Sequence, residues 1–161
     1  MSVKEPQLIG RAELVHFPDL QLSAVPARID TGAKTSSLWA SAVEQDGVLH
    51  VILFGEGSPF YTGEDIHFAS YGTAIVASST GEAQERYKVQ LTVSLAGRKI
   101  RAWFTLADRS AQAYPVLIGR NVLRGKFIVD VAQGTIARDA ERQRSNVLRS
   151  APEKTENEEI V

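Results

Sequence analysis

The sequence predicts an all-β protein, and three observations support this fold class. Residues 87–95 alternate between apolar and polar side chains, with the period of two that is typical of a strand with one buried face. The same alternation resumes over 100–106 after a turn at Ala96 and Gly97, so the two segments predict a long antiparallel hairpin. The wider pattern from Leu8 to Ala137 also consists of strand-like runs separated by turns.

The first half of the chain predicts a second hairpin followed by an irregular excursion. Residues 38–44 and 48–54 form two apolar runs around the turn Gln45, Asp46 and Gly47. Residues 55–71 contain several glycines and aromatic residues without a clear period. We therefore expect a long loop or flap over 55–71.

The second half predicts three short strands and a helical turn. Residues 73–78 form a strand-like run that ends at the turn Ser79, Thr80 and Gly81. In "YPVLIGRNVLRGKFIVDV" we expect a buried strand at 116–118, a helical turn at 120–124 and a strand at 127–131. One short helix is thus expected within the β domain.

The length of 161 residues predicts one domain, which we place at 1–138. Residues 139–161 are rich in charge and poor in large apolar side chains. Such a segment cannot offset its ordering entropy by burial, so we expect a mobile tail, with helix allowed at its start.

The composition argues against several functional classes. A net charge of -1 favours neither nucleic acid nor acidic lipid as a partner. The sequence has no cysteine, no apolar run long enough to span a bilayer and no signal-peptide segment near Met1, so we expect a cytoplasmic protein. It has no glycine-rich phosphate loop of the Walker type either, and we expect no cofactor.

The stretch "RIDTGAKTSSL" carries the main catalytic candidate, Asp30. Two carboxyl groups that share one proton can activate water and protonate a peptide carbonyl. An acid that does this must be held by a tight turn, which Thr31, Gly32 and Ala33 can supply at the end of an apolar run. An Asp-Thr-Gly triplet is also common in ordinary turns, so the triplet alone leaves both interpretations open.

A second element, "VLIGRN" at 116–121, favours the catalytic interpretation. With it, the chain resembles the retropepsin-like aspartic peptidases. The motifs "RIDTGAKTSSL", "SSTGEAQER", "FTLADRS" and "YPVLIGRNVLRGKFIVDV" are similar to a bacterial family known as ATP-dependent zinc proteases and often linked to ATP-grasp ligases that add glutamate to proteins.

This resemblance implies a closed acid-protease barrel in which Asp30 is the catalytic acid. It also implies that Gly119 and Arg120 support the catalytic turn from the segment that crosses behind it. Two positions depart from the pattern of the relatives. Trp39 stands where relatives often have histidine, and Thr35 stands where retroviral enzymes have an acid that pairs with the arginine, so Arg120 needs another partner.

Other polar residues are secondary candidates for a substrate cleft. Asp108 and Arg109 in "LADRS" can line a peptide cleft or form an ion pair that caps a loop. Ser78 and Ser79 can be cleft hydroxyls, but a role in the turn is the simpler interpretation.

The sequence predicts no metal site, although the family name mentions zinc. A catalytic zinc site needs about three histidine or carboxylate ligands, often on a His-Glu-x-x-His helix, and this chain has no such motif. We expect His16, His50 and His67 to be separate surface or turn residues, and Asp65 to be a solvated turn charge.

These observations and the resemblance predict an aspartic endopeptidase, and the resemblance implies peptides or protein tails as its substrates. The chain has one Asp-Thr-Gly and no internal repeat, so we expect a homodimer to bring two Asp30 side chains together. A second acid of the same chain, such as Asp108, is the alternative. Two other functions stay open: a non-catalytic peptide-binding adaptor that works with an ATP-grasp ligase and, less favoured, a zinc-dependent peptidase.

Overall fold

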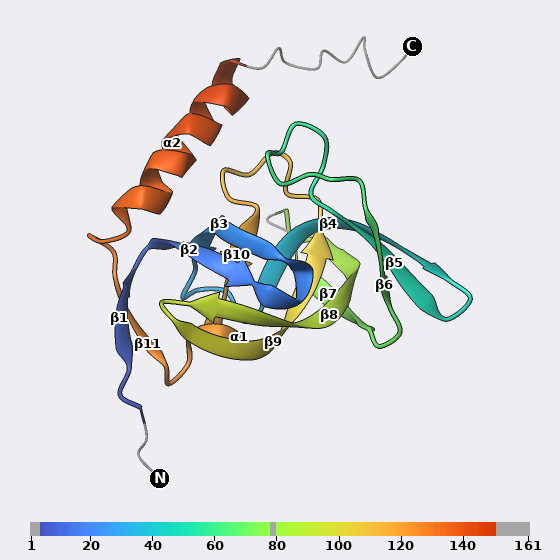
Figure 1. Ribbon diagram of the computed structural model, residues 1–161, viewed down its shortest axis with the longest axis horizontal. Helices are drawn as coiled ribbons and strands as arrows, with labels where there is room; N and C mark the ends of the chain where they lie inside the picture. Colours follow the sequence, from blue (N-terminus) through green and yellow to red (C-terminus); the bar gives the residue numbers. More distant parts are fainter. Residues whose placement is uncertain (1–3, 78–79, 151–161) are drawn as a thin grey trace.

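The computed structural model describes residues 4–77 and 80–150 (Figure 1). Its strands are β1 (Gln7–Gly10), β2 (Ala12–Phe17), β3 (Leu22–Ile29), β4 (Ser36–Gln45), β5 (Val48–Leu53), β6 (Asp65–Phe68), β7 (Gly72–Ala77), β8 (Ala83–Leu95), β9 (Arg98–Ala107), β10 (Val116–Ile118) and β11 (Phe127–Asp130). Its helices are the 3-10 turn η1 (Pro18–Leu20), α1 (Arg120–Leu123) and α2 (Thr135–Ser150).

The fold is built around a closed barrel. Strand order within the main sheet runs β10-β3-β2-β8-β9-β4, and β10 also pairs with β4, which closes the ring. The interior holds fully buried side chains from several of these strands, including Phe17, Leu38, Leu91 and Phe104. The expected all-β class with a closed barrel is confirmed.

Both predicted hairpins are present, with short turns. Strands β8 and β9 pair antiparallel from Lys88 opposite Thr105 to Leu95 opposite Arg98. The two-residue turns Asp46-Gly47 and Ala96-Gly97 have positive φ at both positions, at 52° and 77° and at 50° and 78°. Turns of this kind match the twist of the strands they join.

The β4–β5–β6 part of the sheet extends beyond the barrel. Strand β5 pairs antiparallel with β4 on one side and with β6 on the other. The segment 55–71, expected to be a loop or flap, thus contains a strand. Strand β6 has only four residues, too few for a clear alternation, and its partner β5 fixes it in the sheet.

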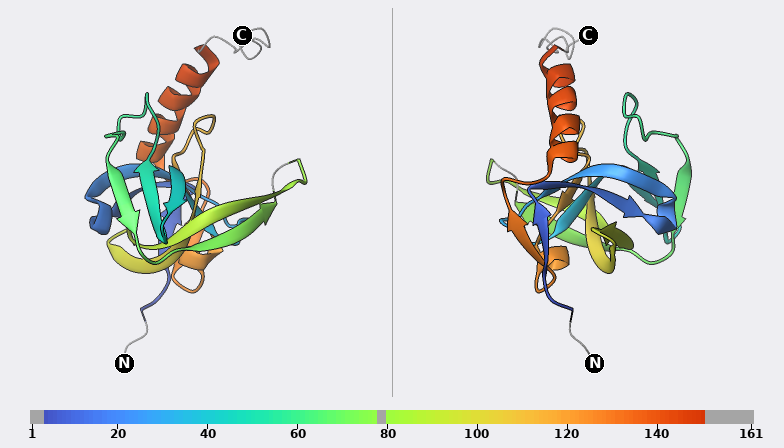
Figure 2. Two further views of the ribbon diagram at one scale, coloured as in Figure 1. Left: turned by 90° about the vertical axis from the view of Figure 1, so that its right-hand side faces the viewer. Right: turned by 60° about the vertical axis from the view of Figure 1, so that its left-hand side comes forward.

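The first and the last of the described strands lie side by side next to the barrel. Strands β1 and β11 form a separate two-stranded parallel sheet, and α2 follows β11 and projects away from the body (Figures 1 and 2). None of the described helices is both long enough and apolar enough to cross a membrane.

The helical content exceeds the expected single short helix. Helix α1 is the predicted one and η1 is additional, while α2 lies partly in the segment at whose start helix was allowed. The expected boundary between residues 138 and 139 falls inside α2, and residues 139–150 are helical. Residues 151–161 lie outside the described part of the chain. Alanine, arginine, glutamate and glutamine dominate much of α2, and these residues have high helix propensity.

Candidate active site

Asp30 lies immediately after β3, where β10 crosses between β3 and β4. Strand β10 pairs parallel with β3, with Ile118 opposite Ile29, and antiparallel with β4. The Asp30 N–H donates a hydrogen bond of 2.8 Å to the Ile118 carbonyl, which continues the pairing by one residue. The buried strand pair therefore fixes the backbone of Asp30, while its side chain is only half-buried.

The turn after Asp30 orients its carboxylate. The Gly32 N–H donates to Asp30 Oδ1 at 3.0 Å, and the Ala33 N–H donates to the Asp30 carbonyl at 3.2 Å. A Cβ at position 32 would lie 3.3 Å from Asp30 Oδ1, a tight contact. Glycine at this position thus leaves room for the carboxylate to accept the backbone hydrogen bond.

Gly119 packs directly against the same turn. A Cβ at this position would lie 2.2 Å from the Thr35 carbonyl oxygen and 2.9 Å from that of Ala33. The following N–H, of Arg120, donates to the Ala33 carbonyl at 2.8 Å. Two segments far apart in sequence therefore meet at backbone contact distance, which only glycine permits.

Arg120 finds a backbone partner in the turn. Its Nη1 donates to the Thr31 carbonyl at 3.2 Å, although the side chain is exposed. Arg120 therefore has a partner in the Asp30 turn, although position 35 holds threonine and not an acid.

Sequence reasoning missed Ser36 and Asn121, which lock the two segments together. Ser36 is completely buried; its Oγ accepts from the Gly119 N–H at 3.0 Å and donates to Asn121 Oδ1 at 2.7 Å. Asn121 Nδ2 donates in turn to the Trp103 carbonyl of β9 at 2.9 Å. The available signal was the pair of serines before Leu38, but the pair does not indicate that Gly119 and Asn121, far along the chain, bond to Ser36.

A cavity of about 430 Å³ adjoins Asp30 and Thr31. Its lining includes the positively charged side chains of three arginines, Arg11, Arg28 and Arg109. The pKa of Arg109 is lowered to about 10, mainly by burial; the positive charges of Arg28 and Arg86 contribute to the shift, and Asp30 opposes it. The cavity is therefore strongly electropositive and contains one carboxylate.

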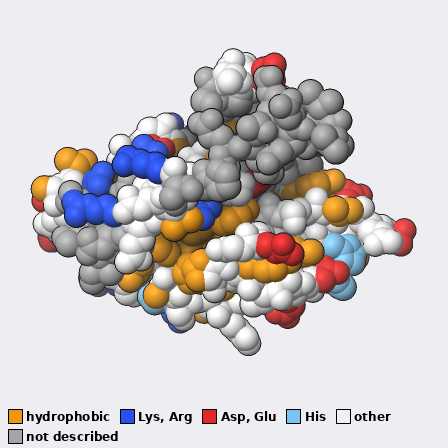
Figure 3. All heavy atoms as spheres, turned by 90° about the horizontal axis from the view of Figure 1, so that it is seen from above, with side chains coloured by type: hydrophobic (Ala, Val, Ile, Leu, Met, Phe, Trp, Pro, Cys, Tyr) orange, Lys and Arg blue, Asp and Glu red, His pale blue; other side chains and the backbone are white. Residues whose placement is uncertain are grey.

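Charge is also unevenly distributed on the outside of the molecule. On the face drawn in Figure 3, basic side chains gather toward one end, and histidine and acidic side chains gather toward the other.

The other residues predicted to line a substrate cleft lie in different places. Arg109 lines the cavity, and its Nε donates to the Tyr114 carbonyl at 3.0 Å. Asp108 does not line the cavity; its carboxylate accepts from the Ser110 N–H at 2.9 Å, a hydrogen bond that lowers the pKa of Asp108. Ser78 and Ser79 lie outside the described residues.

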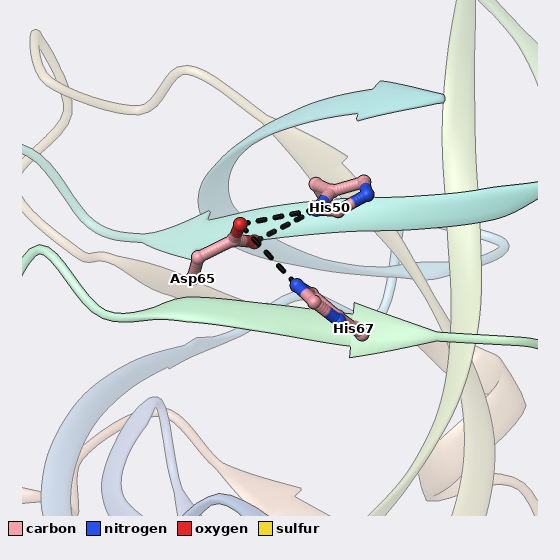
Figure 4. Close-up of polar contacts among 3 residues, drawn as sticks. All are labelled: His50, Asp65 and His67. Carbon is pink, nitrogen blue, oxygen red and sulfur yellow. Dashed lines mark hydrogen bonds and ion pairs between the residues drawn. The ribbon is translucent and has the colours of Figure 1, made fainter. Parts of the chain in front are cut away.

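The sequence predicted that the three histidines are separate, but two of them lie together. His50 of β5 lies directly opposite His67 of β6, and both rings contact the Asp65 carboxylate (Figure 4). Asp65 begins β6 and is therefore not merely a solvated turn charge. His16 lies elsewhere, on β2, where its Nδ1 accepts from the Ala24 N–H at 3.1 Å. The prediction of separate histidines was wrong because the pairing of β5 with β6 brings together residues that lie 15 or more positions apart in the sequence.

Barrel, crossover strand and Asp-Thr-Gly turn together define a protein of the retropepsin-like class. A family model described as "Retropepsin-like aspartic endopeptidase RimB" matches residues 8–140. The chain belongs to this RimB-like family.

Individual similar proteins have other names. Proteins named "Probable alpha-L-glutamate ligase" from Shewanella pealeana and Shewanella halifaxensis are 29% and 30% identical over 133 residues, which is 78% of this chain. The match spans only 29% of the length of those relatives. A crystal structure of a Legionella pneumophila protein of unknown function superposes with a TM-score of 0.59 at 25% identity, and covers 79% of this chain and 95% of that one.

Proposed function

We propose that this protein is an aspartic endopeptidase in which Asp30 activates the hydrolytic water. The observation that carries the proposal is the position of Asp30 on a turn braced by Gly32 and Gly119, at the wall of an electropositive cavity. A carboxylate that accepts a backbone hydrogen bond beside a cavity is suited to act as a general base.

The mechanism needs a second acid. Two Asp30 carboxylates, one from each subunit of a symmetric dimer, would share one proton, because two like charges so close together cannot both ionise. One carboxylate would take a proton from water as the water attacks the peptide carbonyl, and the protonated partner would donate to the carbonyl oxygen. Asp108 is a poorer second acid, because it does not line the cavity of Asp30.

The cavity favours acidic peptides as substrates. Arg11, Arg28 and Arg109 present cationic groups around Asp30, and arginine is the residue best suited to bind carboxylates. The names of the ligase relatives point to the same chemistry, since an α-L-glutamate ligase would produce glutamate-rich chains. We therefore propose glutamate-rich peptides or protein tails as the substrate class.

Substitution of Asp30 by asparagine tests the catalytic proposal. Asp30→Asn keeps the size of the side chain but removes the base, so cleavage of a glutamate-rich peptide should fall by about a hundredfold or more. Mass spectrometry of the products gives the rate and the cleaved bond. The matched control is Asp46→Asn in the exposed β4–β5 turn, which should cleave at the wild-type rate.

An adaptor that binds peptides without cleaving them is the second candidate. It is favoured by the occurrence of a similar segment within larger proteins named as ligases, where the match makes up 29% of their length. An adaptor would bind a glutamate-rich peptide or an ATP-grasp ligase equally well with Asp30→Asn and would produce no cleavage in either form. Cleavage that stops with a chelator but survives Asp30→Asn would instead indicate a zinc-dependent peptidase.

A further inference from the structure

The cluster of His50, Asp65 and His67 is a candidate site that the peptidase mechanism does not use. His50 Nδ1 lies 3.0 Å from Asp65 Oδ2, and His67 Nε2 lies 3.3 Å from the same oxygen (Figure 4). One ligand atom from each of the three residues lies within 4.8 Å of the others. None of the three lines the cavity beside Asp30.

The strands place these side chains on one face of the sheet. Asp65 and His67 are two residues apart on β6 and share a face, and His50 is the cross-strand partner of His67. The neighbours of His50 on β5, Leu49 and Val51, are fully buried on the opposite face. The backbone of the cluster is thus anchored to the core, while its donor atoms face solvent.

The donor set and its two distances to Asp65 match a transition metal. A tetrahedral zinc ion with bonds of about 2.0 to 2.1 Å separates its ligand atoms by about 3.3 Å, close to the distances between each histidine nitrogen and Asp65. Two imidazoles and one carboxylate suit Zn²⁺ and similar ions better than Ca²⁺ or Mg²⁺, which prefer oxygen ligands throughout. We propose that His50, Asp65 and His67 bind one divalent transition-metal ion, with Zn²⁺ as the reference ion.

The hydrogen-bonding pattern is compatible with an exchange of protons for metal. Without metal, a histidine nitrogen must carry a proton to donate to the Asp65 carboxylate. With metal, Nδ1 of His50 and Nε2 of His67 offer lone pairs, and each neutral ring carries its proton on the other nitrogen. The fourth position of the ion is left to solvent or to a ligand from outside the cluster.

Metal binding would join β5 to β6 at the base of the segment that connects them. That segment runs over 54–64, and its residues 57–60 line an apolar cavity of about 410 Å³ together with Trp39. A metal link would restrict the motion of this segment without contacting Asp30. The proposal is therefore independent of the proposed peptidase activity.

Zinc titration of the chain without any added histidine tag tests the proposal. Isothermal titration calorimetry should give one Zn²⁺ per chain, and His50→Ala and His67→Ala should each weaken binding by about tenfold or more. The control variant His16→Ala removes a histidine outside the cluster and should bind zinc as the wild type does.

A second measurement is made on the wild-type chain, so it does not depend on whether the variants fold. In the wild-type chain, Zn²⁺ should shift the ring resonances of His50 and His67 in NMR spectra and leave those of His16 unchanged. Hydrogen exchange in β5 and β6 should also slow. Absence of stoichiometric zinc binding by the folded wild type, or equal loss with His16→Ala, would overturn the proposal.

Discussion

At the scale of single residues, the buried hydroxyl of Ser36 holds the two halves of the Asp30 site together. It is the acceptor for the Gly119 N–H and the donor to Asn121. Ser36→Ala would leave the buried Gly119 N–H without its acceptor, so the free energy of unfolding should fall by about 1 to 3 kcal/mol. Urea denaturation measures this change. Ser41→Ala, at an exposed position of the same strand, should change it little.

Arg28 provides a residue-scale test of substrate charge. Its exposed side chain lines the Asp30 cavity, so Arg28→Gln should raise KM for a glutamate-rich peptide roughly tenfold, the effect of losing one charge-assisted contact. KM for the matching glutamine-rich peptide should stay unchanged. The control is Arg101→Gln, because Arg101 pairs with Asp19 outside the cavity. Equal effects on both peptides would argue against recognition of carboxylates.

The Asp65 carboxyl makes a third residue-scale prediction. The hydrogen bond from His50 is the main cause of its lowered pKa, and the bond from His67 acts in the same direction. This interaction stabilises the fold above the unfolded pKa of 3.8 and is lost as the pH falls through the lower folded value. In His50→Ala the pKa of Asp65, followed by NMR, should move up toward 3.8, whereas His16→Ala should not change it. An unchanged Asp65 pKa in His50→Ala would contradict the assigned hydrogen bond.

At the scale of elements, Arg144 links helix α2 to the loop before β10. Arg144 Nη2 donates to the Ser110 carbonyl at 2.6 Å, and Arg144 and Val147 line the apolar cavity that also includes Trp39. Arg144→Ala should therefore raise hydrogen exchange throughout α2. The exposed Arg149 gives the control Arg149→Ala, and equal exchange in both variants would show that Arg144 does not anchor the helix.

The elements also show what sequence patterns can and cannot predict. The hairpins and β10 were predictable because alternation and turn residues are local signals, and the Asp30 turn was predictable from its resemblance to known peptidases. The contact of Ser36 with Gly119 and the meeting of His50 with His67 depend on which strands become neighbours. The pairing of distant strands depends on the whole fold, and no local periodicity of the sequence predicts it.

At the scale of the whole molecule, the peptidase proposal requires two chains. The described part of one chain places a single Asp-Thr-Gly turn at the cavity, so the second carboxylate of the dyad would have to come from a second copy. A symmetric contact would double the arginine content of the cleft and would extend its affinity for acidic chains. Activity would then depend on the concentration of subunits.

Subunit mixing tests whether two Asp30 residues form the catalytic pair. Wild-type chain is equilibrated with increasing amounts of Asp30→Asn chain, and cleavage of a glutamate-rich peptide is measured at constant wild-type concentration. If each active site needs an Asp30 from both subunits, the excess variant captures wild-type chains in inactive pairs, and the activity should fall toward zero. Asp46→Asn, with its site intact, should not reduce the wild-type contribution. Wild-type activity that persists undiminished in a large excess of Asp30→Asn would contradict a catalytic pair of Asp30 residues.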